Sequence, residues 1–89
     1  MSPYIKQEDR KKVDPLVEKI IETISSEPTE NQDGMINYLM SKVLLGIYKP
    51  KYFNFNRAMG VLNCITQEFY RRFVAPYEDE KIKENGDIK

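Results

Sequence analysis

The sequence predicts an all-α fold, a compact bundle of three to four helices with a long central third helix. Apolar residues recur at three- and four-residue steps in three separate stretches, which is the spacing of one face of an α-helix. Proline and glycine, the usual helix-start and helix-stop residues, stand between these stretches. No alternating apolar and polar run supports a sheet, and residues 48–55 (YKPKYFNF) would make one strand without a partner. The 89 residues therefore predict one helical domain, residues 1–89.

The first helix is expected from Pro15 to about Ser25. Asp14 precedes it as a side chain that accepts hydrogen bonds from free backbone N–H groups, and a proline at the first helical position loses no needed donor. Its apolar face comprises Val13, Leu16, Val17, Ile20, Ile21 and Ile24. Residues 4–12 are charged and too short to be stable alone, so they form a short helix or a lead-in. The pattern leaves open whether residues 1–12 pack on the bundle.

The second helix is expected to begin near Asp33, because residues 25–34 (SSEPTENQDG) are rich in loop-forming types. Its core-facing residues are Ile36, Leu39, Met40, Val43, Leu44 and Ile47. Gly46 weakens the last turn, and Pro50 forbids continuation. Tyr52 and Phe53 would then cap the core in the connection that follows.

The third helix is expected from about Phe55 to Val74, roughly 30 Å at about 1.5 Å per residue. One apolar side comprises Phe55, Ala58, Met59, Val61, Leu62, Ile65, Phe69, Phe73 and Val74. The opposite polar face comprises Asn56, Gly60, Asn63, Gln67 and Arg71. Ala75-Pro76 should end this helix, since a residue before proline is pushed away from helical torsions. A short fourth helix, about Tyr77 to Glu84, would stop at Gly86.

Composition excludes several classes of protein. Fourteen basic and fourteen acidic residues cancel, which removes the positive field of a protein that holds nucleic acid through phosphate charge. One cysteine and no histidine leave no internal disulfide and none of the usual zinc sites, and no cofactor motif occurs. No signal peptide or membrane-length apolar run is present, which predicts a cytoplasmic protein. A chain this short has a modest core, so oligomerisation is an expected source of stability.

The polar face of the third helix has three readings: a solvated back, a ligand groove or a subunit contact. A glycine inside a helix costs about 1 kcal/mol relative to alanine, so Gly60 indicates a position where another backbone comes close. A close helix crossing, as with the same helix of a second subunit, is the first explanation, and a ligand is the second. The arginines could bind an anion, but the acids in YEDE (77–80) follow closely and could fold back onto them. The candidate binding residues are Asn56, Arg57, Gly60, Asn63, Gln67, Tyr70, Arg71 and Arg72.

Catalytic alternatives are weaker. Glu18, Glu22, Glu68 and Asp79 could be imagined as magnesium ligands of an all-α nucleotide pyrophosphohydrolase, but the paired E-E-x-x-E and E-x-x-D pattern of those enzymes is absent. Cys64 has no histidine to deprotonate it, which favours a packing role. The sequence therefore predicts no enzyme, no catalytic residue and no metal site.

Five stretches of the chain are distinctive: YIKQEDR near the start, INYLMSKVL, NRAMGVL-C, EFYRR and VAPYEDEKIKENGDI at the end. Together they resemble a family of small uncharacterised proteins encoded by bacteria, archaea and phages. No assigned activity accompanies this resemblance, so it transfers no site. A phage setting implies, by analogy alone, a host protein or a small nucleotide signal as partner.

Three functional hypotheses follow, in order of preference. The first is a non-enzymatic helical binding protein that self-associates as a homodimer through apolar and aromatic residues around its second and third helices. The second is a nucleotide-handling protein in which arginines hold phosphate while Tyr70 or Tyr77 stacks on the base. The third, duplex binding through Arg71 and Arg72 or through residues 6–12, is disfavoured by the neutral net charge.

Overall fold

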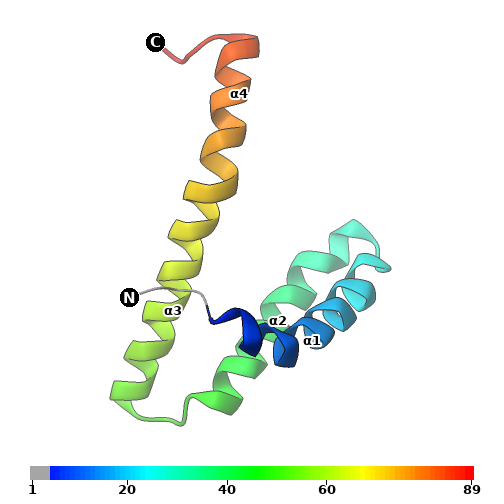
Figure 1. Cartoon of the computed structure of the whole chain (residues 1–89), viewed down its shortest axis with the longest axis vertical. Helices are drawn as coiled ribbons and strands as arrows, with labels where there is room; N and C mark the ends of the chain where they lie inside the picture. The colour runs from blue at the N-terminus through cyan, green and yellow to red at the C-terminus, as the bar shows by residue number, and fades with distance from the viewer. Residues whose placement is uncertain (1–4) are drawn as a thin grey trace. The chain divides into compact units, whose positions relative to one another are not determined.

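The computed structural model describes residues 5–89, and the chain is helical along almost all of them (Figure 1). The elements are α1 (Gln7–Ser25), α2 (Thr29–Ile47), α3 (Tyr52–Phe69), the π-helix η1 (Tyr70–Val74) and α4 (Ala75–Asn85). No strand occurs within residues 5–89, so the predicted all-α class is confirmed. The chain divides into two compact units, Met1–Phe55 and Asn56–Lys89. The single domain expected from the length of the chain stays a prediction.

Helix α1 begins eight residues earlier than the sequence pattern indicated, at Gln7 instead of Pro15. Pro15 lies inside the helix, where it removes one backbone hydrogen bond. Glu8 and Asp9 occupy the first turn, where negative charge meets the positive end of the helix dipole. The predicted start is therefore wrong, because proline at an internal position was taken as proline at a helix start. Of the predicted lead-in, residue 4 lies outside the described residues.

The connection between α1 and α2 is a short turn, and the predicted long loop over residues 25–34 is wrong. Only residues 26–28 separate the two helices, which contact each other within the first unit. Pro28 precedes Thr29 with φ of −57°, a torsion already compatible with helix entry. The Gln32 side-chain amide donates a 3.0 Å hydrogen bond to the carbonyl of Glu27, which ties the turn to the new helix. Polar composition alone did not distinguish this first helical turn from a loop.

Helix α2 ends at Ile47, as expected from Gly46 and Pro50. Helix α3 then begins at Tyr52, three residues before the expected start. The side chains of Tyr52 and Phe53 are 82% and 72% exposed, so they do not cap a core. That prediction is wrong because both aromatic residues belong to the first turn of α3 and project into solvent.

Helix α3 continues through η1 into α4 without a break, so the predicted end at Ala75-Pro76 is also wrong (Figure 1). Proline lacks an N–H group, and its ring clashes with the carbonyl four residues earlier in an α-helix. The wider π-turn accommodates this, because the N–H of Ala75 bonds the carbonyl of Tyr70, five residues back. Gly86 ends α4 as expected, with φ of 88°, a torsion that favours glycine. The helical residues 56–85 of the second unit are called the rod below.

Few side chains are buried. Among the described residues, the buried apolar residues are Ile24, 8% exposed, in the first unit and Ala58, 9% exposed, in the second. Many residues of the predicted core faces remain accessible, including Leu16, Ile21, Ile36, Val43, Ile47, Met59, Ile65, Phe69 and Phe73. No helix within residues 5–89 combines the length and the apolar character needed to span a membrane.

Candidate functional site

The polar face expected on the third helix exists as a row on the rod. Asn56, Asn63 and Gln67 are exposed, as is Gly60, whose position would give an added Cβ no neighbouring atom within 4 Å. In the single chain no other side chain or backbone approaches Gly60, so a ligand or a close helix crossing by a second subunit there stays a prediction. This arrangement agrees with the reading of a solvated back.

Arg71, the last residue of that polar row, binds a carboxylate of its own helix. Its Nη2 donates to both carboxylate oxygens of Glu68, each at 2.8 Å. Glu68 is the more buried partner, with 25% of its side chain exposed against 67% for Arg71. Glu68 is a partner that the sequence reading did not consider, and it lies within reach because residues three apart are neighbours on a helix. A contact between the arginines and the acids of residues 77–80 stays a prediction. An exposed pair of this kind contributes at most about 1 kcal/mol.

The three candidate arginines do not converge. Arg57 and Arg71 are both on the rod, fourteen residues apart, which corresponds to about 21 Å along a helix axis. Two arginine side chains cannot reach the same phosphate over that distance. The nucleotide hypothesis with Arg57, Arg71 and Arg72 acting together therefore gains no geometric support and stays a prediction.

The carboxylates considered as magnesium ligands belong to both units of the chain. Glu18 and Glu22 are on α1 in the first unit, whereas Glu68 and Asp79 lie eleven residues apart on the rod. Within residues 5–89, no group of three or more His, Cys, Asp or Glu side chains gathers. Cys64 is a free thiol on the rod and is exposed instead of packed, which corrects the expected packing role.

Tyr70 and Glu78 are joined across the π-helix. The Tyr70 hydroxyl donates a 2.5 Å hydrogen bond to Oε1 of Glu78, eight residues further along the rod. In a regular α-helix, at about 100° per residue, positions eight apart point about 80° away from each other. The extra residue of η1 removes most of that difference and brings the two side chains to one side. The hydrogen bond to Glu78, then the negative charge of Glu78, raises the pKa of Tyr70.

An apolar stripe follows the rod on the side opposite the polar row. Its members are Met59, Leu62, Ile65, Phe69, Phe73 and Tyr77. The rings of Phe69 and Phe73 have centroids 5.3 Å apart at 56°, a tilted aromatic contact. Both are 59% exposed, and Tyr77 is 62% exposed with Lys81 Nζ 5.5 Å from its ring centroid. The sequence predicted this stripe up to Phe73, but Tyr77 joins it only through the π-helix.

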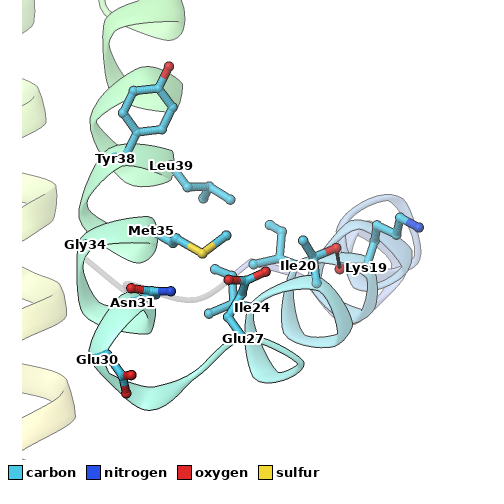
Figure 2. Close-up of a pocket in the computed structure, with 11 residues that line it drawn as sticks. Lys19, Ile20, Ile24, Glu27, Glu30, Asn31, Gly34, Met35, Tyr38 and Leu39 are labelled. Carbon is cyan, nitrogen blue, oxygen red and sulfur yellow. Dashed lines mark hydrogen bonds between the residues drawn. The ribbon is translucent and has the colours of Figure 1, made fainter.

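The first unit holds a concave feature that sequence reasoning missed. A cavity of about 690 Å³ opens between α1 and α2 (Figure 2). Ile20, Ile24, Met35 and Leu39 supply apolar walls. The remaining lining residues are Lys19, Thr23, Glu27, Glu30, Asn31, Gly34 and Tyr38. Four of the eleven lining residues, Glu27, Glu30, Asn31 and Gly34, lie in the stretch that was predicted to be a loop. A helix start recognised after Pro28 would have placed the last three of them on α2.

Comparison with known proteins gives a family and no function. No curated protein and no solved structure matched the chain. One family model, described as a domain of unknown function (DUF6899), matches residues 1–88. That match extends over nearly the whole chain and agrees with the resemblance to an uncharacterised family. The chain therefore belongs to the family described as a domain of unknown function, DUF6899.

Proposed function

We propose that this protein is a non-enzymatic helical interaction protein that associates with itself, as a homodimer, through the apolar stripe of its rod. The single observation that carries the proposal is the exposure of that stripe, above all at Phe69 and Phe73, each 59% exposed. Contiguous exposed apolar surface marks an interaction site in soluble proteins.

The construction of the second unit supports this proposal. Residues 56–85 form one continuous helical rod, so the unit contains no second helix against which its own stripe could pack. An amphipathic helix gains most of its stability in a protein from packing its apolar face. The rod therefore requires a cover from outside its own unit.

Helix lengths support a second molecule as part of that cover. The rod comprises thirty residues, about 45 Å, whereas α1 and α2 have 19 residues each, about 28 Å. A first-unit helix laid along the rod would leave roughly a third of it open. A second rod matches the full length, and the compact bundle expected from the sequence would then be completed by assembly.

The polar row faces away from such a contact. Its exposed amides and the internally paired Arg71 keep one side of the rod in water, as an amphipathic helix at an interface requires. Under this proposal, the candidate residues from Asn56 to Arg72 are the solvated back of the interaction helix. A host protein as a further partner remains an expectation from the resemblance.

Sedimentation velocity at micromolar concentration tests the proposal. The wild-type chain is expected to sediment as a dimer, and the double variant Phe69→Ser/Phe73→Ser as a monomer. Cys64→Ser, an exposed site off the stripe, is the matched control and should remain dimeric. Far-ultraviolet circular dichroism on each variant verifies that helices persist. A monomeric wild type, or a double variant as dimeric as the control, contradicts the proposal.

A further inference from the structure

We infer that the two rods of the dimer pair antiparallel, about a two-fold axis that crosses the apolar stripe at the height of residue 71 and sets Phe69 of each copy against Phe73 of the other. This inference rests on the proposed self-association and adds its geometry. A two-fold contact is isologous, so one patch must complement itself. The pair of rings at Phe69 and Phe73, 5.3 Å apart, is suited to meet its own copy as a cluster of four rings.

The π-helix supplies the register for this pairing. The hydrogen bond between Tyr70 and Glu78 shows that positions eight apart share a side of the rod across η1. Phe69 and Tyr77 have the same spacing and therefore lie on the same side. With the axis at the height of residue 71, Ile65 of one copy lies opposite Tyr77 of the other. Both are exposed in the single chain, at 48% and 62%.

Charge along the rod favours the antiparallel direction. Residues 56–72 carry three arginines and one glutamate, whereas residues 77–85 carry four acidic residues and two lysines, so the net charges are +2 and −2. With antiparallel rods centred at residue 71, the acidic residues 77–85 of one copy lie beside residues 57–65 of the other, whose one charged residue is Arg57. Parallel rods would place like charges side by side, and charge arranged in this way selects orientation. The antiparallel arrangement of the two helix dipoles also favours this orientation.

The exposed area is of the right order for a dimer. An aromatic side chain presents about 150–250 Å² when fully accessible, so a ring that is 60% exposed offers roughly 100 Å². Phe69, Phe73 and Tyr77 together then contribute roughly 300 Å² per copy, more than a third of the about 800 Å² that a standard interface buries on each partner. Met59 and Ile65, 58% and 48% exposed, extend the surface.

Spin-label distances on the full chain test this geometry. Single cysteines are introduced on the exposed polar row, as Asn56→Cys and separately as Gln67→Cys, in a Cys64→Ser background. Because each chain carries only one spin label, the dipolar coupling measured by pulsed electron paramagnetic resonance reports the distance between labels on two copies. Antiparallel rods centred at residue 71 separate the two labels at position 56 by about 45 Å along the axis and those at position 67 by about 12 Å. Adding the width of two helices, the expected distances are near 50 Å and near 30 Å.

The outcomes separate the inference from the proposal on which it rests. A long distance at position 56 together with a short one at position 67 supports antiparallel pairing. Equal short distances at both positions mean parallel rods, and long distances at both mean contact elsewhere; either result overturns the geometry but leaves a dimer. No coupling at either position, with a monomer in sedimentation, overturns the self-association itself.

Discussion

Tyr70 and Glu78 form a 2.5 Å hydrogen bond between residues eight apart on one helical rod, a contact that the π-helix η1 makes possible. The presence of this hydrogen bond therefore indicates that the rod contains the extra residue of η1. Where the extra residue of η1 is present, Tyr70 meets Glu78 and Tyr77 joins the apolar stripe. Where it is absent, both relationships are lost together.

The ionisation of Tyr70 tests this contact. The neutral hydroxyl donates to Glu78, and this bond followed by the glutamate charge raises the pKa above the ordinary 10.0. Any stabilisation from the bond is therefore fully present below pH 10 and is lost as the pH rises through the raised pKa. The titration is followed by absorbance at 295 nm in the wild type and in Tyr70→Phe. The difference between the two curves is the contribution of Tyr70, and its midpoint should lie above pH 10. Glu78→Gln keeps an acceptor but removes the charge, so it should lower the pKa of Tyr70; an unchanged titration would contradict the contact.

Pro76 is predicted to hold η1 in place. In Pro76→Ala, the new N–H can bond the carbonyl four residues back, and a regular α-helix becomes available. Helical circular dichroism at 222 nm should be retained or rise, while Tyr70 and Glu78 turn apart and the pKa of Tyr70 falls toward its ordinary value. Because Tyr77 would leave the stripe, the dimer dissociation constant should increase by about tenfold, or about 1.4 kcal/mol. If dissociation and the Tyr70 titration are both unaffected, Pro76 does not set the register.

Pro15 is predicted to weaken α1. It lies inside the helix, where proline is about 3 kcal/mol less favourable than alanine. Pro15→Ala should raise the free energy of unfolding by roughly 1–3 kcal/mol, measured by thermal and urea melts. Pro28→Ala is the matched control, because Pro28 precedes α2 with a compatible torsion and should give no gain. A Pro15→Ala variant no more stable than wild type would mean that residues 7–14 are not helical.

Ile24 is predicted to be the most sensitive apolar position of the first unit. It is 8% exposed, whereas Ile21, three residues earlier on the same helix, is 53% exposed. Truncating a buried isoleucine to alanine costs about 2–5 kcal/mol, so Ile24→Ala should lower stability by an amount near the lower end of that range in so open a unit. Ile21→Ala should cost less than about 1 kcal/mol. Equal losses in urea denaturation would contradict the packing of α1 against α2.

Local sequence signals identified the helices well and their proline-bearing boundaries poorly. Gly86 and Pro50 were interpreted correctly because a positive φ and a missing N–H act within a few residues. Pro15 and Pro76 were taken as boundaries, yet both lie within continuous helix. Proline is about 3 kcal/mol less favourable than alanine inside a helix, a cost that the packing of the surrounding helix can offset and that a π-turn can reduce.

The sequence predicted the polar and apolar faces of the third helix, but it did not predict which positions align across the π-helix. Three- and four-residue steps placed Asn56, Asn63 and Gln67 opposite Phe69 and Phe73, because side chains repeat every 3.6 residues on any α-helix. The same arithmetic separates Tyr70 from Glu78 and leaves Tyr77 off the stripe. Only the extra residue in η1 places Tyr70 beside Glu78 and Tyr77 on the apolar stripe.

The amino-acid sequence by itself determined the all-helical class and the two faces of the third helix, since both depend on periodicity. The tertiary structure decided which apolar faces remain open and which positions align across η1. The periodicity of a sequence identifies the apolar face of a helix, but whether that face is buried depends on which other elements are available to pack against it.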